Sequence, residues 1–279
     1  MNLPNLSWML NVSELRYIQS LCEAADYRNP DALVGAFLPL QRRVACVLRG
    51  RFLMSQLRAK PFYHYLLART KYYDEVFLDA VVHDAVRCII NIGCGGDTRA
   101  HRFEKLLRKN GVTVLECDQP RAIQAKQKIA QRRWPTDHIE YVGLDLHDGR
   151  WAGLARVLGE NSSARMLVMM EGVSPYIDTP SFEAFLRFLA ARLHPRSVLA
   201  YDFKIADTPE NLSRASRLPQ PFRLPGKRKQ VADYHAALGF QLRHMELSNG
   251  LCRRLLPRAA LLFDWDCLLR LSPSERISS

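Results

Sequence analysis

The sequence lacks the cysteine spacing that marks a disulfide framework or a zinc site. Its seven cysteines are odd in number and scattered, and no two of them form a C-x-x-C motif. His, Cys, Asp and Glu likewise show no metal-ligand spacing, so we expect no metal. This usage argues against small disulfide-rich secreted scaffolds and predicts reduced, mostly structural thiols in a cytoplasmic protein.

Long apolar runs are also missing. No stretch approaches the roughly 18 consecutive apolar residues that are typical of a transmembrane helix, and the first ten residues have neither a basic segment nor a long apolar core. We therefore expect no spanning helix, no signal peptide and no membrane partner. Internal repeats and low-complexity segments are absent as well. The 279 residues predict one large domain, or one domain with an added helical piece.

Acidic residues are in deficit, since 28 Asp and Glu stand against 40 Lys and Arg and give a formal net charge of +12. Such a balance is typical of proteins that meet nucleic acid or an anionic surface. Here the basic residues are spread along the chain, and the densest run, at 227–229, is short. We therefore favour a solvated surface or an anionic small substrate, and do not expect a nucleic-acid partner.

Residues 11–86 carry a helical pattern with few strand signals. Apolar side chains recur at intervals of three and four between residues 15 and 22. A break follows at Asn29-Pro30, because the residue before a proline avoids the α region. Further helices are predicted from residue 31, over 44–57 and over 61–68. We interpret residues 1–86 as an N-terminal helical cap.

From residue 87 the pattern changes to strands that alternate with helices, which is typical of βαβ units and a parallel sheet. The apolar fourth strand suggests a central position covered on both faces, and the last two strands suggest an antiparallel hairpin. We interpret residues 87–279 as one α/β core, with 204–228 as an insertion or lid. The predicted strands span 88–92, 112–117, 139–143, 165–170, 197–203, 240–245 and 259–269, and the predicted helices include 98–110, 229–238 and two that open at Pro120 and Pro180.

The stretch 87–99 carries the clearest local signal. An apolar strand stops at a cluster of three glycines between residues 93 and 96, and a helical stretch follows from Thr98. Strand, glycine turn and helix together let the backbone approach a ligand closely. The third glycine of a dinucleotide fingerprint is missing, and Asp97 stands where a pyrophosphate would bind. An adenosyl group that carries a sulfonium therefore fits better than NAD.

Polar or glycine clusters follow four successive predicted strands, at 93–97, 118, 145–146 and 171–172. Ligands of open α/β sheets bind at the carboxyl ends of the strands, so we expect these clusters to lie together. Asp118 comes about twenty residues after the glycine turn, where an acid can accept both hydrogen bonds from a ribose diol.

Five motifs in this order resemble the leucine carboxyl methyltransferase family of class I S-adenosylmethionine-dependent O-methyltransferases, which includes many bacterial enzymes of natural-product pathways. The resemblance covers about residues 15–203, and the glycine motif with its Asp-Thr-Arg is its most specific part. It implies a seven-stranded, mostly parallel, Rossmann-like methyltransferase sheet that binds S-adenosylmethionine. The motifs are ARTKYYDE at 68–75, NIGCGGDTR at 91–99, ECDQP at 116–120, YVGLDL at 141–146 and MEGVSPYI at 170–177.

The resemblance also implies a role for each site residue. Arg69 would hold the methionine carboxylate, Asp118 would take the ribose hydroxyls, and Glu171 would lie near the methionine end of the cofactor. Asp145 and the backbone of Leu146 would meet the adenine. The turn of Gly93, Cys94 and Gly95 would pass close to the cofactor. The family has a second basic residue near the Ala24-Ala25 position of this chain, a place that Arg28 is the candidate to fill.

The expected reaction is methyl transfer to a carboxylate of an anionic small molecule or of a peptide. A carboxyl group is already ionised at neutral pH and needs no base, so alignment would supply most of the catalysis. A hydroxyl acceptor, such as a secondary metabolite, would need a general base; His101 and His147 are candidates, but neither belongs to a defined motif. The alternatives are this hydroxyl O-methyltransferase and a nucleic-acid-binding protein with a methyltransferase-like core.

Overall fold

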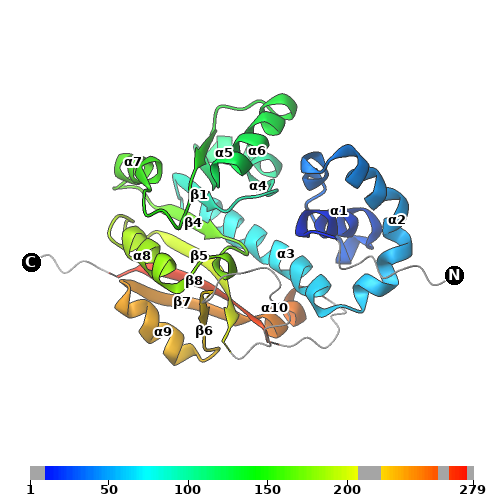
Figure 1. Ribbon diagram of the computed structural model, residues 1–279. Coiled ribbons are helices and arrows are strands. Elements are labelled where there is room, and N and C mark those ends of the chain that lie inside the picture. The colour runs from blue at the N-terminus through cyan, green and yellow to red at the C-terminus, as the bar shows by residue number, and fades with distance from the viewer. Residues whose placement is uncertain (1–9, 207–220, 257–263, 275–279) are drawn as a thin grey trace, which may run out of the picture. The chain divides into compact units, whose positions relative to one another are not determined.

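The fold is built around one mixed sheet (Figure 1). The computed structural model describes residues 10–206, 221–256 and 264–274. The chain forms two units. A helical unit comprises Met1–Glu75, Gly96–Arg102 and Ser248–Phe263, and a sheet unit comprises Val76–Gly95, Phe103–Leu247 and Asp264–Ser279. The chain passes from one unit to the other within the glycine turn, between residues 95 and 96.

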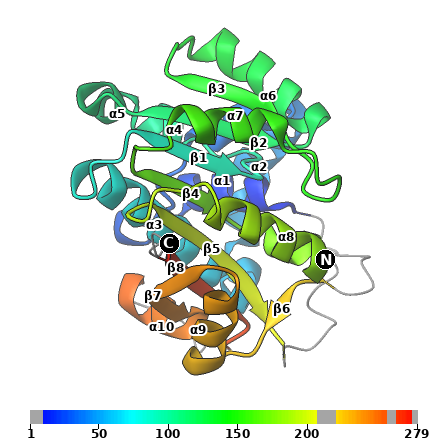
Figure 2. The same cartoon turned by 90° about the vertical axis from the view of Figure 1, so that its left-hand side faces the viewer.

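The strand order is β3-β2-β1-β4-β5-β8-β7, with the short β6 paired to β5 (Figure 2). Neighbours from β3 to β5 are parallel, whereas β8 runs antiparallel to both β5 and β7. The predicted mostly parallel α/β sheet is confirmed. The strands are β1 Cys88–Ile92, β2 Thr113–Asp118, β3 Ile139–Gly143, β4 Met166–Met170, β5 Val198–Ile205, β6 Arg223–Leu224, β7 Phe240–Leu247 and β8 Asp266–Pro273.

The central strands are buried along their whole length. All five residues of β1 and all five of β4 are inaccessible to solvent, as expected for parallel strands covered on both faces. The predicted central place of the fourth strand is thus confirmed, since β4 lies between β1 and β5. These buried central strands fix the positions of the loops that follow the carboxyl ends of β1 to β4.

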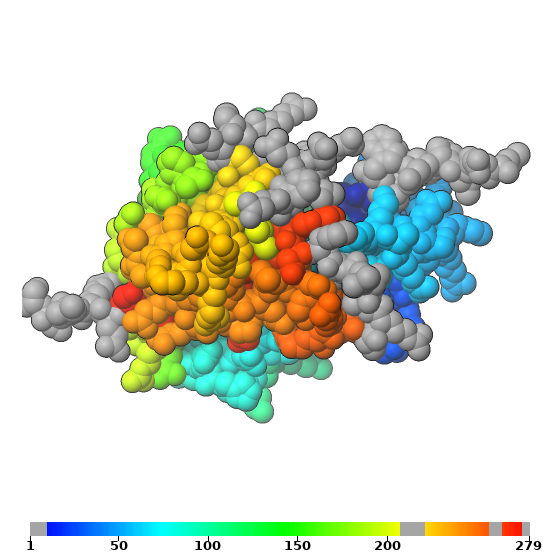
Figure 3. All heavy atoms as spheres, turned by 90° about the horizontal axis from the view of Figure 1, so that it is seen from below, coloured from blue at the N-terminus to red at the C-terminus, as the bar shows by residue number. Residues whose placement is uncertain are grey.

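The helices of the sheet unit connect its strands (Figure 1). Gly111 ends α5 with a φ of +63°, as predicted for a C-terminal glycine. Asp178 caps α8, because its carboxylate accepts a hydrogen bond from the Ser181 N–H at 2.9 Å. Figure 3 shows α9 on the outer face of this unit, where it covers β7. The helices are α5 Glu104–Asn110, α6 Pro120–Arg133, α7 Ala152–Glu160, α8 Thr179–Ala190 and α9 Arg228–Ala237, with a short 3₁₀ turn η4 at Ser174–Tyr176.

The helical unit begins with α1, whose N-terminus is closed by a capping box in which Asn11 and Glu14 bond each other's backbone N–H groups at 2.9 Å. Helix α3 then continues far beyond residue 68, where the apolar pattern was expected to end. The elements are α1 Val12–Cys22, η2 Ala25–Tyr27, η3 Leu33–Phe37, α2 Leu40–Arg58, α3 Pro61–Val82, α4 Arg99–Arg102 and α10 Ser248–Leu255.

Three expectations about elements are wrong. The helix expected from residue 31 is the 3₁₀ turn η3, because Asp31 bonds the Val34 N–H instead of entering a helix. The helix expected over 98–110 is broken at Phe103 into α4 and α5. Of the strand expected over 259–269, residues 259–263 lie outside the described part of the chain; the strand β8 spans Asp266–Pro273, and helix α10 separates it from β7.

The predicted lid 204–228 is described only at its ends. Residues 207–220 lie outside the described part of the chain, and Arg223–Leu224 extend the sheet as β6. None of the helices in the described ranges combines the length and the apolar composition that crossing a bilayer requires.

A buried histidine should make folding stability depend on pH. His235 donates from Nδ1 to the Val231 carbonyl and accepts from the Tyr201 hydroxyl at Nε2, and burial lowers its pKa to about 4. The unfolded chain, with a histidine pKa near 6.5, therefore binds this proton first as the pH falls. We expect the free energy of unfolding to be highest above pH 6.5 and to fall by about 3 kcal/mol towards pH 4 through this residue.

Denaturant unfolding at several pH values, on wild type and His235→Gln, measures this loss. The variant should be less stable at pH 7 and show a shallower decline between pH 6.5 and 4. Equal declines in the two proteins would contradict the role assigned to His235.

Candidate functional site

A cavity of about 300 Å³ opens at the carboxyl ends of β1, β2, β3 and β4, within the sheet unit. Asp118, the last residue of β2, lies on one wall, and the loop after β4 forms a second wall with the apolar side chains of Val173 and Ile177. Its lining comprises Ile92, Gly93, Asp118, Gln119, Leu144, Asp145, Leu146, His147, Gly172, Val173, Tyr176 and Ile177.

The Asp118 carboxylate holds the turn that it faces. One oxygen accepts a hydrogen bond from the Gly95 N–H at 2.7 Å, and the other accepts from the Gln119 N–H at 2.7 Å. Each carboxylate oxygen has two lone pairs, so both can accept a further bond. Asp118 is only partly buried and lines the cavity, which leaves that capacity available to a ligand.

Gly93 is required for steric reasons. Its φ is +63°, and a Cβ added there would lie 2.4 Å from Val173 Cγ2 on the opposite side of the turn. Only glycine satisfies both conditions. The Gly172 N–H, in turn, donates to Asp202 on β5 at 2.7 Å, so the two glycines at the cavity are fixed by separate strands.

The loop after β3 supplies the third wall. Leu144 and Leu146 are buried, and the Leu144 N–H donates to the Asp118 carbonyl at 2.8 Å. Asp145 accepts a hydrogen bond from the His147 N–H at 3.0 Å and lies 3.3 Å from its Nδ1. Nε2 of the same ring lies 3.8 Å from Asp178, so this histidine stands between two carboxylates.

The structure brings together five of the residues proposed from the sequence, namely Gly93, Asp118, Asp145, Leu146 and the candidate base His147. Gly95 belongs to the same turn through its bond to Asp118. Cys94 does not line the cavity; its N–H donates to the Cys117 carbonyl at 3.0 Å, and burial raises the pKa of its thiol. Glu171 lies at the end of β4, outside the cavity lining.

Arg69 belongs to the helical unit, where it lies buried on α3 beside the ring of Tyr65. Arg28 belongs to the same unit, and its Nε donates to the Glu23 carbonyl at 3.1 Å. The roles that the family resemblance gives to Arg69, Glu171 and Arg28 stay predictions.

Apolar lining residues are what the sequence analysis missed. Ile92, Leu144 and Ile177 are apolar residues next to the motif acids and glycines, and nothing in an apolar residue by itself separates a cavity wall from a core position. Tyr176 is 51% exposed, and its place within the 170–177 motif was the one usable signal.

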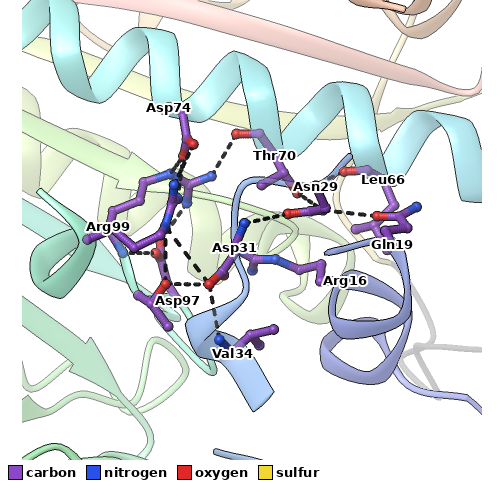
Figure 4. Close-up of polar contacts among 12 residues, drawn as sticks. Arg16, Gln19, Asn29, Asp31, Val34, Leu66, Thr70, Asp74, Asp97 and Arg99 are labelled. Carbon is purple, nitrogen blue, oxygen red and sulfur yellow. Dashed lines mark hydrogen bonds and ion pairs between the residues drawn. The ribbon is translucent and has the colours of Figure 1, made fainter. Parts of the chain in front are cut away.

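The second half of the glycine motif has a structural task in the helical unit (Figure 4). Asp97 accepts hydrogen bonds from the Arg99 N–H at 2.8 Å and from Arg99 Nη1 at 2.6 Å, so its charge is neutralised by a fully buried guanidinium. The expectation that Asp97 repels a pyrophosphate is therefore wrong, because this carboxylate is compensated within the protein.

The ionic cluster extends to two further aspartates. Arg99 Nε donates to Asp74 at 2.7 Å, and Arg102 donates to the same carboxylate at 2.6 and 2.7 Å. Asp31 accepts from Arg16 at 2.6 Å and from the Thr98 hydroxyl. Three arginines and three aspartates thus connect α1, the segment before η3, α3 and α4 (Figure 4).

The model of the leucine carboxyl methyltransferase family matches residues 35–190 of this chain. A putative S-adenosyl-L-methionine-dependent methyltransferase of Mycolicibacterium paratuberculosis is 30% identical over 61% of this chain and 51% of its own length. A second, from Mycobacterium avium, is 28% identical over 63% of this chain and 61% of its own length. The chain therefore matches between about half and three fifths of the length of these relatives.

Two solved structures share the fold. A putative methyltransferase from Thermobifida fusca YX has a TM-score of 0.60 at 10% identity and covers 98% of each chain. A putative sarcosine dimethylglycine methyltransferase from Galdieria sulphuraria has a TM-score of 0.51 at 13% identity, covering 75% of this chain and 88% of its own.

The ionic cluster yields a stability prediction. Arg99→Met removes the guanidinium that pairs with Asp74 and Asp97 and leaves buried carboxylate charge with less compensation. Removing one partner of a buried ion pair costs about 3 to 5 kcal/mol, and we expect a loss of unfolding free energy of that order in denaturant titrations.

Arg108→Met is the matched control. Arg108 pairs with Glu104 and Asp137 on the surface, where solvent screens the charges, so this variant should unfold like wild type. Similar stability of the Arg99→Met protein and wild type would show that the cluster does not hold the helical unit together.

Proposed function

Because this chain belongs to the leucine carboxyl methyltransferase family, we propose that it transfers the methyl group of S-adenosylmethionine to an oxygen atom, and that its acceptor is a carboxylate. The observation that carries the proposal is the cavity at the ends of β1 to β4, with Asp118 on one wall and apolar side chains on the other. The acceptor is an anionic small molecule or a peptide.

The cavity fits the nucleoside half of the cofactor. Asp118 has two oxygens with free lone pairs, which suits a ribose diol. Leu144, Leu146 and Ile177 offer apolar surface to an adenine ring, and the Gly93 backbone has no side chain to block its approach. The missing third glycine disfavours NAD, although the charge of Asp97 no longer counts against it.

The bound cofactor supplies a methyl group activated by its positively charged sulfur. The protein binds and orients the cofactor. Asp118 holds the ribose, and Gly93, which has no side chain, leaves room for Val173 beside the turn. We assign Arg69 to the methionine carboxylate, because a guanidinium donates two parallel hydrogen bonds to a carboxylate, and Glu171 to the neighbourhood of the methionine amine.

A carboxylate acceptor needs no general base, because it is ionised at neutral pH. A hydroxyl acceptor is the second candidate, and one observation favours it. His147 lines the cavity, and its ring nitrogens lie 3.3 Å from Asp145 and 3.8 Å from Asp178, which makes it the candidate to accept the proton of a hydroxyl acceptor.

Cofactor binding is the first test. We expect calorimetry to detect binding of S-adenosylhomocysteine to wild type, and Asp118→Asn to weaken it about tenfold or more, because hydrogen bonds to a charged group contribute about 1.5 to 3 kcal/mol. Asp148→Asn is the matched control, since Asp148 follows β3 in the next loop without lining the cavity, and should bind like wild type. No binding to wild type would overturn the proposal.

The acceptor class can be tested through His147. If the acceptor is a carboxylate, His147→Gln should have the same kcat as wild type. The kcat should also stay constant between pH 6 and 9, since no proton leaves the acceptor. Transfer to a hydroxyl should lose about 10² to 10⁴-fold in kcat in the same variant. A loss of that size would replace the carboxylate proposal with the hydroxyl one.

A further inference from the structure

A second cleft, of about 650 Å³, lies at the amino end of β5, whereas the cofactor cavity lies at the carboxyl ends of β1 to β4. It is formed by the segment after α8, the start of β5, the middle of β7 and the end of β8, all within the sheet unit. Its lining comprises Ser162, Arg192, Leu193, His194, Pro195, Arg196, Ser197, Val198, Arg243, Ser272 and Pro273.

The charged side chains that line this cleft are all positive. Three arginines and a histidine line it, and the described lining includes no Asp or Glu. Two of the arginines are held by neutral groups. Arg192 stacks over the Phe188 ring, 4.1 Å from its centroid, and Nη1 donates to the Phe188 carbonyl at 3.3 Å. Arg243 Nε donates to the Ser272 hydroxyl at 2.7 Å.

Neutral partners orient a guanidinium without cancelling its charge. Each of these arginines therefore keeps further N–H groups and a full positive charge for a ligand, and a cleft lined by one sign of charge concentrates its field. Guanidinium groups bind phosphate oxygens in a bidentate manner.

An irregularity in the sheet places one of the arginines. On β7, Leu242 pairs with Leu271 and His244 pairs with Arg270, so Arg243 is an extra residue opposite no partner on β8. Such a bulge redirects a side chain, and bulges are frequent beside binding sites. Here the bulged residue is the one that meets Ser272 at the cleft.

The rest of the lining consists of three serines and four apolar residues. Leu193, Pro195, Val198 and Pro273 line the same cleft, whose volume falls in the range of small-molecule sites. Apolar walls with cationic groups suit an organic phosphate better than a bare inorganic ion, which has no apolar part to bury.

We propose that this cleft is a binding site for a small organic phosphate, with Arg192, Arg196 and Arg243 as the groups that contact its phosphate oxygens. The inference does not rest on the proposed methyl transfer, because none of the residues that line this cleft lines the cofactor cavity.

Calorimetry on the full chain at 0.15 M salt tests it, with phenyl phosphate as the organic probe and inorganic phosphate beside it. Phenyl phosphate should bind with one site and more tightly than inorganic phosphate. Arg243→Gln and Arg192→Gln should each weaken it about tenfold or more. Both side chains are exposed, so both variants should fold, which thermal unfolding checks.

Arg132→Gln is the matched control, because it removes the same charge from an exposed position on α6 away from the cleft, and it should leave binding unchanged. No binding of phenyl phosphate to wild type, or equal weakening in the control, would overturn the proposal. Binding of a single-stranded oligonucleotide but not of phenyl phosphate would also overturn it, and would assign the positive charge to nucleic acid instead.

Discussion

Compensation of buried charge is the constraint on which the helical unit depends. Asp31, Asp74 and Asp97 are almost inaccessible to solvent, and each lies against an arginine within 2.7 Å. Isolated charges could not remain there, because the cost of removing an ion from water is several kcal/mol even after relaxation. The cluster therefore commits four chain segments to one arrangement, and α4, which follows the glycine turn, is one of them.

This arrangement divides the glycine motif between two tasks. Residues 93–95 belong to the sheet unit and shape the cavity, whereas residues 96–99 belong to the helical unit and supply Asp97 and Arg99 to its ionic cluster. The glycine motif, which in the sequence has the pattern of a single ligand-binding signature, thus also holds the helical unit together. In this chain the Asp-Thr-Arg part of the motif forms charge pairs and hydrogen bonds inside the protein.

The sequence predicted the sheet well, because buried parallel strands such as β1 and β4 are continuous apolar runs bounded by glycine and charged residues. It predicted Gly93, Asp118, Asp145 and Leu146 at one cavity because the ends of parallel strands converge. It missed α7 and α10, although both bury residues at helical spacing, and it expected a longer helix at η3, where the Asp31 carboxylate bonds the Val34 N–H. The pairing of Arg99 with Asp74 and the bulge at Arg243 depend on residues distant in sequence, so no local pattern carries them.

The insertion of β8 between β5 and β7 has a consequence for how the chain is made. β7 leaves the ribosome before β8 but has no direct contact with β5 in the sheet, so a nascent chain that ends near residue 260 carries two strands with unpaired edges. Exposed edges are the sites at which incomplete sheets aggregate. β8 follows every other described strand in sequence yet lies in the interior of the sheet, so both of its neighbours stay uncovered on that side until β8 has been made.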